Sequence, residues 1–188
     1  MTRADAVAAV ANAVGPGTAI VACNGMIGRE LYTRADAPTR FYMIGSMGLA
    51  SSIGLGLALV RPSARVVVFD GDGNLLMNLG GLANVAAAGP RNFHHVVFDN
   101  AAHGSTGYQC TVSDRVALDA VARAAGYRRC HRVADAAALA ALLPAWFDED
   151  GPSMLLVEVE RGNVPGIGRV EPTPVEITER FRDACRSC

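Results

Sequence analysis

Two kinds of segment alternate along this chain, and the alternation restricts its fold more than any other feature. Short runs rich in β-branched residues are typical of strands buried on both faces, and they lie at residues 18–23, 65–70, 93–99 and 154–159. Stretches rich in Ala and Leu at helical spacing separate these strands, at residues 5–14, 46–60, 75–88, 116–125 and 135–147. Strands that alternate with helices across short connections form βαβ units. We therefore expect an α/β fold with three layers (αβα), in which helices cover both faces of a mostly parallel sheet.

The last part of the chain is less regular. A weaker strand is predicted at 129–133, and a short final helix at 175–184 follows several Pro and Gly residues. No internal repeat or long linker divides the sequence. We expect a single domain over residues 1–188, with an irregular C-terminal tail from about 161 to 188.

Composition excludes several functional classes. Net charge is −1 and no block of Lys or Arg forms a basic stripe, so nucleic acid is a poor candidate partner. The longest apolar run, 47–60, is shorter than the roughly 20 residues of a membrane span, so no membrane association is expected. Charged residues make up 19% of the chain, against an average of about 25%, which favours an oligomer.

The cysteines indicate a reducing compartment. Five scattered cysteines are an odd number and do not form a disulfide framework, so we expect a cytoplasmic protein. Cys185 and Cys188 have the spacing of a metal or redox pair, but no second pair accompanies them.

The first unusual strand end precedes the predicted helix 46–60. Gly45, Ser46, Met47 and Gly48 bring small residues to a helix start, where backbone amides and the helix dipole favour an anion. The alternative is that these glycines only permit close packing of the helix on the sheet. This segment alone does not separate the two interpretations.

Two further strand ends carry oxygen-bearing side chains. Asp72 lies between two glycines directly after the strand 65–70, and Asn100 follows the next strand, one βαβ crossover later. Consecutive parallel strands end at the same edge of a sheet, so Asp72 and Asn100 are expected to lie close together. Carboxylate and amide oxygens suit Mg²⁺. Taken alone, Gly-Asp-Gly also fits a simple turn.

Together these motifs resemble the diphosphate-binding domain of thiamine-diphosphate-dependent enzymes. The strings FYMIGSMGLASSIGLGLAL, FDGDGNLLMNLGGLANVA and FDNAAHGSTGYQ are similar to those of sulfopyruvate and phosphonopyruvate decarboxylases. Asp99 stands where many members have Asn, but Asn100 keeps the position that binds the metal in the family. The resemblance implies the thiamine-diphosphate-binding fold, with thiamine diphosphate and Mg²⁺ as cofactors.

The resemblance also implies roles for individual residues. The side chains of Asp72 and Asn100 and the backbone carbonyl of Ala102 would bind Mg²⁺. Met47 would be the apolar wedge that bends the cofactor, although without the resemblance a core residue is the favoured interpretation. Gly45 would accept a hydrogen bond from the aminopyrimidine, and Ser46 would help to bind phosphate. The complete implied cofactor-binding set is Gly45, Ser46, Met47, Gly71, Asp72, Gly73, Asn74, Asn100 and Ala102.

Several titratable residues lie near these motifs. His103 is in a Gly- and Ser-rich loop beyond a strand end, where its imidazole could bind an anionic substrate or transfer a proton. The alternative is a loop histidine that only binds a backbone carbonyl. His94 and His95 are expected on opposite faces of one strand, so they do not form a metal-binding pair. Asp70 and Asp99 end strands and could support the metal site from behind.

The family's activating glutamate comes from a separate pyrimidine-binding domain. We expect no room for a second such domain in this chain, and Glu30, Glu158 and Glu160 lie in no second cofactor-binding pattern. The expected assembly is therefore a hetero-oligomer in which another subunit carries the pyrimidine domain and its glutamate. A homodimer of this chain alone could form, but it would be inactive.

The activity implied is non-oxidative decarboxylation of a small 2-oxo acid, of the sulfopyruvate or phosphonopyruvate type. A cationic side chain should then hold the second anion of the substrate, and Arg115 and Arg169 are both candidates. Three alternatives stay open: carboligation by an acetolactate-synthase-like subunit, a non-catalytic cofactor-binding or regulatory subunit, and a nicotinamide-binding Rossmann protein. The last is disfavoured because no Gly-x-Gly-x-x-Gly opens a helix after the first strand.

Overall fold

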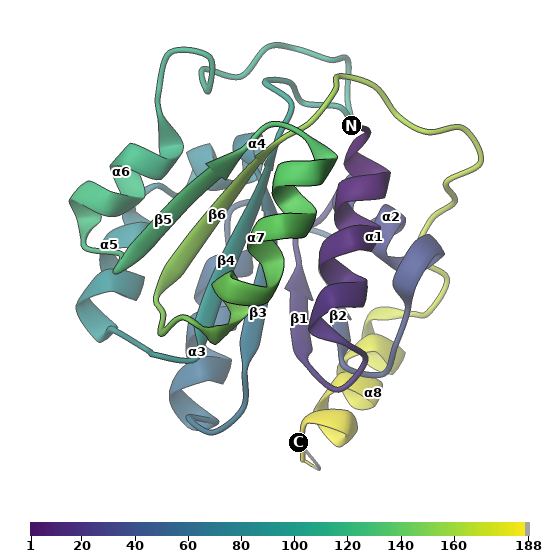
Figure 1. Ribbon diagram of the computed structural model, residues 1–188. Coiled ribbons are helices and arrows are strands. Elements are labelled where there is room, and N and C mark those ends of the chain that lie inside the picture. Colours follow the sequence, from purple (N-terminus) through teal and green to yellow (C-terminus); the bar gives the residue numbers. More distant parts are fainter. Residues whose placement is uncertain (187–188) are drawn as a thin grey trace.

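A computed structural model describes residues 1–186 of the chain, and its centre is one six-stranded sheet (Figure 1). The strand order is β2-β1-β3-β4-β6-β5, and every neighbouring pair is parallel. The strands are β1 (Ala19–Ala22), β2 (Arg40–Tyr42), β3 (Val66–Gly71), β4 (Phe93–Asp99), β5 (Arg129–Val133) and β6 (Ser153–Glu158). The predicted parallel sheet is confirmed, including the weaker strand at its edge.

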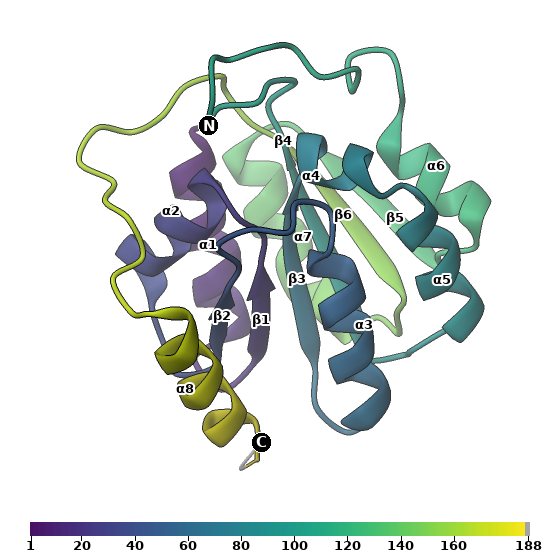
Figure 2. The same cartoon turned by 180° about the vertical axis from the view of Figure 1, so that it is seen from behind.

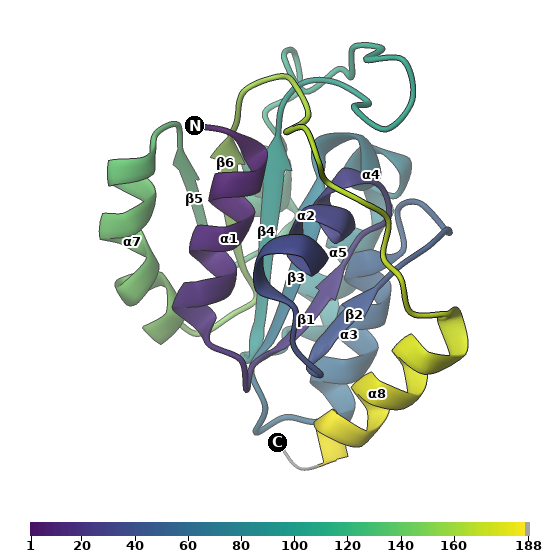
Figure 3. The same cartoon turned by 90° about the vertical axis from the view of Figure 1, so that its right-hand side faces the viewer.

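Helices cover both faces of this sheet, so the predicted αβα layering is confirmed. Helices α1 and α7 lie on one face (Figure 1), and α3, α5 and α6 lie on the other (Figure 2). Helix α2 packs beside α1, and α8 packs against edge strand β2 (Figure 3). The helices are α1 (Arg3–Val14), α2 (Met26–Ala35), α3 (Ala50–Val60), α4 (Asp72–Met77), α5 (Gly80–Ala88), α6 (Leu118–Ala125), α7 (Ala136–Asp148) and α8 (Pro174–Arg186). Among residues 1–186, no helix has the length and apolar character needed to cross a bilayer.

The register of the two central strands fixes the position of the candidate site. Strands β3 and β4 pair in parallel, with Gly71 opposite Phe98 at their carboxyl ends. All six residues of β3 are buried, as expected for a strand covered on both faces. Asp72 and Asn100 therefore leave the sheet at the same edge, as the sequence predicts.

Two predicted helices differ from the observed ones. The predicted helix 75–88 is two helices: α4 begins earlier, at Asp72, and the chain breaks at Asn78 (φ −146°, ψ 55°) before α5 begins. The predicted helix 46–60 begins only at Ala50, because Ser46 (φ 55°) and Gly48 (φ 93°) adopt left-handed backbone conformations that a helix cannot contain.

The sequence analysis missed α2 and β2. Strand β2 has only three residues, too few to show a periodic pattern. Helix α2 buries Ile27 and Leu31, but Gly28 and several polar residues weaken its helical pattern. The C-terminal tail is irregular from 161 to 173 and then forms α8, while Cys188 lies outside the described residues.

The two histidines of β4 point to opposite faces of the sheet, as predicted. His94 Nδ1 lies 2.9 Å from Ser153 Oγ, and its ring packs against Trp146. On the other face, His95 Nε2 lies 3.3 Å from a carboxylate oxygen of Asp70. Both histidines have polar partners within the core, so neither is available as a metal ligand.

Candidate cofactor site

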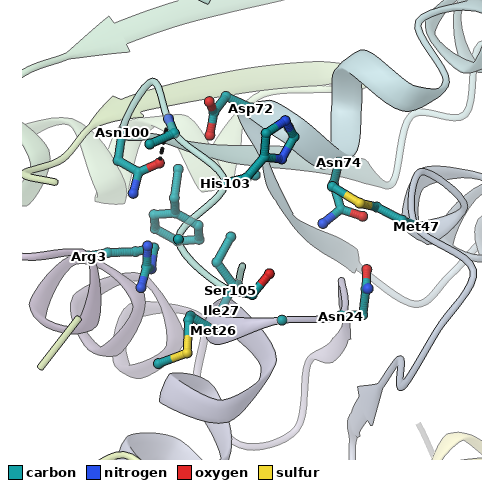
Figure 4. A pocket seen from close by; sticks show the side chains of 16 residues that line it. Arg3, Asn24, Met26, Ile27, Met47, Asp72, Asn74, Asn100, His103 and Ser105 are labelled. Atoms are coloured by element: carbon teal, nitrogen blue, oxygen red, sulfur yellow. Dashed lines mark hydrogen bonds between the residues drawn. The ribbon is translucent and has the colours of Figure 1, made fainter. Parts of the chain in front are cut away.

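A cavity opens at the carboxyl edge of the sheet, where β1, β3 and β4 end (Figure 4). Side chains from all three strand ends converge on it, and helix α1 adds Arg3. The structure brings together most of the residues that the sequence singled out, namely Met47, Gly71, Asp72, Gly73, Asn74, Asn100, Ala102 and His103. Gly45 and Ser46 lie outside this cavity, on an exposed loop that leads to Met47.

Asp72 is the first residue of α4, and its carboxylate is almost completely buried, with 3% of the residue exposed. Burial raises the pKa of Asp72, and the nearby carboxylate of Asp99 raises it further. Hydrogen bonds to the carboxylate from the Thr111 hydroxyl (2.5 Å) and from the backbone of Gly73 and Asn100 oppose this shift of the pKa. A cation beside Asp72 would favour its charged form and offset the cost of burial.

Asn100 and Ala102 supply further oxygen atoms. Asn100 Oδ1 accepts a hydrogen bond from the Ala102 N–H (3.2 Å), and the Ala102 carbonyl accepts one from the Gly104 N–H (3.1 Å). Each of these oxygens has a second lone pair. One carboxylate and two carbonyl-type oxygens match the hard ligands that Mg²⁺ prefers. Residues 1–186 contain no cluster of three or more His, Cys, Asp and Glu side chains suited to a metal, so this mixed set is the candidate metal site.

Two buried polar atoms in this cavity have no hydrogen-bond partner: Asn100 Nδ2 and Asn24 Oδ1. A buried polar group without a partner costs about 1–3 kcal/mol. A polar ligand in the cavity would supply the missing hydrogen bonds, so these atoms fit the binding of a group such as thiamine diphosphate.

The turn after β3 leaves its backbone uncovered. A Cβ built on Gly73 would lie 2.6 Å from both Nδ1 and Cε1 of His103, and 3.5 Å from Cε of Met47. The imidazole therefore rests directly on the glycine. Figure 4 shows the His103 side chain between those of Asp72 and Asn74. Any side chain at position 73 would displace His103 or close the cavity.

The loop that carries Met47 is fixed to α4 by two asparagines. Asn74 Oδ1 accepts a hydrogen bond from the Gly48 N–H (2.9 Å), and Asn78 Nδ2 donates one to the Gly48 carbonyl (3.1 Å). Gly48 has a φ of +93°, and a Cβ there would lie 3.0 Å from Met77 Cβ. Met47 is thus held beside the Asp72 turn although the two are far apart in the sequence.

A polar layer supports the metal-site candidates from behind. Ser113 Oγ donates to Asp99 Oδ1 (2.7 Å), and the same carboxylate oxygen accepts from the Ala101 N–H (3.0 Å). Asp99 therefore lies where the sequence predicted a supporting carboxylate. Asp70 does not support the site, because its side chain points into the core towards His95.

Sequence reasoning missed Asn24, Arg3 and Thr111. Asn24 follows the buried strand β1, so the rule that found Asp72 and Asn100 could have found it too. Arg3 is held by two hydrogen bonds to Glu30 (2.9 and 2.8 Å) and by one to Asn163 Oδ1 (2.8 Å). No sequence signal links these distant positions.

The fold and this site define the class of protein. The sequence profile of the family described as "Thiamine pyrophosphate enzyme, C-terminal TPP binding domain" matches residues 21–157. The chain therefore belongs to this family, and the resemblance found in the sequence is confirmed.

Individual relatives of the chain are decarboxylases. The chain is 47% identical over 163 residues to the sulfopyruvate decarboxylase subunit beta of Methanothermobacter thermautotrophicus, covering 86% of this chain and 84% of that protein. It is 46% identical over 164 residues to the phosphonopyruvate decarboxylase of Streptomyces viridochromogenes, covering 87% of this chain but 41% of the relative. The chain thus spans less than half of the phosphonopyruvate decarboxylases it matches.

Solved structures support the fold. The benzoylformate decarboxylase of Polynucleobacter necessarius superimposes with a TM-score of 0.70 at 17% identity, over 86% of this chain and 34% of that one. At this identity the likeness shows the shared α/β fold only.

Proposed function

We propose that this chain is the cofactor-binding subunit of a thiamine-diphosphate- and Mg²⁺-dependent decarboxylase that acts on a small 2-oxo acid of the sulfopyruvate or phosphonopyruvate type. One observation carries the proposal: Asp72 and Asn100, from neighbouring strand ends, line a single cavity together with the uncovered turn at Gly73. The printed names of the relatives supply the reaction and the substrate class.

In this proposal the residues of the cavity hold the cofactor. Asp72, Asn100 and the carbonyl of Ala102 bind Mg²⁺, which neutralises the diphosphate. The backbone amides at Gly73 and Asn74, in the first turn of α4, hold the diphosphate itself. The loop with Gly45, Ser46 and Met47 supports the remainder of the cofactor, with Met47 as its apolar wedge.

When bound, the cofactor's positively charged ring supplies the electron sink that decarboxylation requires. The chain's own residues orient the reactants and exclude water. His103 lines the cavity, where its imidazole can bind the substrate carboxylate or deliver a proton to the product. Met47 adds an apolar wall.

The activating glutamate is assigned to a separate pyrimidine-domain subunit. Three carboxylates of this chain were considered as replacements, and each forms an ion pair: Glu30 with Arg3, Glu158 with Arg132 and Glu160 with the N-terminal amine. The name "subunit beta" of the archaeal relative supports a hetero-oligomer. Cys23, Cys110 and Cys130 form no disulfide, which fits a cytoplasmic location.

Turnover by the reconstituted pair tests this function. The chain, mixed with a pyrimidine-domain subunit, should release carbon dioxide and an aldehyde from sulfopyruvate or phosphonopyruvate, and the chain alone should not. An acyloin product would instead identify a carboligase. Cofactor binding without turnover in any reconstituted pair would favour a non-catalytic subunit.

A further inference from the structure

A second cavity adjoins the cofactor site and contains two arginines. Its lining residues come from the start of α2, the segment after β2 and the tail before α8. Figure 3 shows this tail running past α2 and β2 to α8. Its volume is about 400 Å³, and Gly25 lines both this cavity and the cofactor site. Met43 and Ile44, which directly precede the cofactor-binding loop at Gly45, form part of its wall.

The two arginines, Arg29 and Arg169, have no compensating charge. Neither side chain makes a hydrogen bond or an ion pair within the described part of the chain, and no Asp or Glu lines the cavity. Most other arginines of the protein have partners, such as Arg132, which pairs with both Asp119 and Glu158. The remaining lining residues are Gly, Pro and apolar side chains, so Arg29 and Arg169 are the only charged residues among the described residues that line this cavity.

We propose that Arg29 and Arg169 bind the second anionic group, the sulfonate or phosphonate, of the substrate. Guanidinium groups offer several N–H donors in a planar fork that matches tetrahedral oxyanions. Because the cavity opens beside the cofactor site, one end of a short dianionic 2-oxo acid can lie here while its reacting carbon faces the cofactor. The identity of the substrate rests on the proposed function, whereas the anion site rests on the cavity itself.

The structure also distinguishes between Arg115 and Arg169, the two candidates that the sequence offered for binding the second anion. Both side chains are exposed, but Arg169 lines this cavity, whereas Arg115, in the segment before α6, lines neither this cavity nor the cofactor site. Arg29 lies in α2, which the sequence analysis missed. The tail thus places Arg169 at the same cavity as Arg29, although the two residues are more than a hundred positions apart in the sequence.

Binding of substrate analogues to the full chain tests this inference. The probes are 3-phosphonopropanoate and 3-sulfopropanoate, which keep both anionic groups but lack the reactive ketone, with propanoate as the mono-anionic control. Arg29→Gln and Arg169→Gln should each weaken binding of the dianions by about tenfold or more, because a charge-assisted hydrogen bond is lost. Arg115→Gln is the matched control and should bind them as the wild type does.

The outcomes separate this inference from the proposed function. Titration with thiamine diphosphate and Mg²⁺ should be the same for the wild type and all three variants. Unchanged dianion binding in Arg29→Gln and Arg169→Gln, an equal loss in Arg115→Gln, or no dianion binding by the wild type would overturn the anion site and leave the cofactor assignment intact. Conversely, loss of dianion binding in the two variants of a protein that binds no cofactor would overturn the proposed function alone.

Discussion

Two regions of the protein, the core between α3 and the sheet and the carboxyl edge of the sheet, each contain a glycine that lies very close to a neighbouring side chain. The two neighbouring side chains differ. In the interior, a Cβ on Gly54 of α3 would overlap with Cγ2 of Val68 and lie 3.2 Å from the Phe93 ring. At the edge, a Cβ on Gly73 would overlap with the ring of His103. Val68 is a stiff side chain on a central strand, whereas His103 is on a loop. The first contact fixes helix packing, and the second can yield to a ligand.

Buried polar groups show the same difference. In the interior, His94 is paired with Ser153. At the edge, Asn24 Oδ1 and Asn100 Nδ2 have no partner, and these are two of the five such atoms found in residues 1–186. Trp146 Nε1, in the interior beside His94, is a third, but Trp146 does not line the cofactor cavity. The two asparagine atoms line that cavity together, which indicates that the edge is organised for a ligand.

The largest effect on stability should come from the interior histidine. Burial, together with the nearby Arg65, lowers the pKa of His94 to about 4, from 6.5 in the unfolded chain. The unfolded state therefore binds a proton more tightly, and the free energy of unfolding should fall by about 3 kcal/mol as the pH drops from 6.5 to 4. Urea denaturation across this pH range measures the effect. His94→Gln should remove most of this pH dependence, and an unchanged slope in that variant would contradict the assignment.

Gly54→Ala tests the tight interior contact. The added methyl group overlaps with Val68, a cost that exceeds the roughly 1 kcal/mol gained in helix propensity, so we expect a loss of about 2 kcal/mol. Gly56→Ala is the matched control in the same helix, because a Cβ there meets nothing within 4 Å. Gly56→Ala should stabilise the protein slightly. Similar thermal stability of the two variants would show that the contact is not rigid.

Gly73→Ala should have a smaller effect on stability but a clear effect on the site. The new Cβ displaces the ring of His103, which can move on its loop, so the free energy of unfolding should change by less than about 1 kcal/mol. Affinity for thiamine diphosphate should fall, because the methyl group covers the turn that holds the diphosphate. Gly80→Ala, which meets open space, is the control. A stability loss equal to that of Gly54→Ala would remove the distinction between interior and edge.

The sequence predicts the parts of the site that depend on local pattern. The β-branched runs identify β3 and β4, and the handedness of βαβ crossovers then places Asp72 and Asn100 at one edge. The resemblance adds their roles and those of Met47 and Ala102. The inferences about Asp72, Asn100 and Ala102 depend only on β3, β4 and the segments that follow them, whereas Met47 lies before β3 and its role comes from the resemblance alone.

The sequence does not predict what distant segments contribute. Arg3 from α1 reaches the cofactor cavity only through tertiary packing, and α2, which carries Arg29, has a weak helical pattern. The sequence named Arg169 as a candidate but could not separate it from Arg115, because its position also depends on tertiary packing. The boundary error at Ala50 has a local cause, because the left-handed conformation of Ser46 is unusual for a residue with a side chain. Backbone conformations of this kind are set by the hydrogen bonds that hold Gly48 on α4.

The central claim is that Asp72 and Asn100 share one divalent cation that holds the diphosphate. Calorimetry with thiamine diphosphate and Mg²⁺ on the wild type, Asp72→Ala and Asn100→Ala tests it most directly, with Asp114→Ala as an exposed carboxylate control at the same edge. We predict that each of the two site variants loses well over tenfold in affinity, or more than about 1.4 kcal/mol, while the control binds normally. Wild-type affinity in Asp72→Ala would contradict the account.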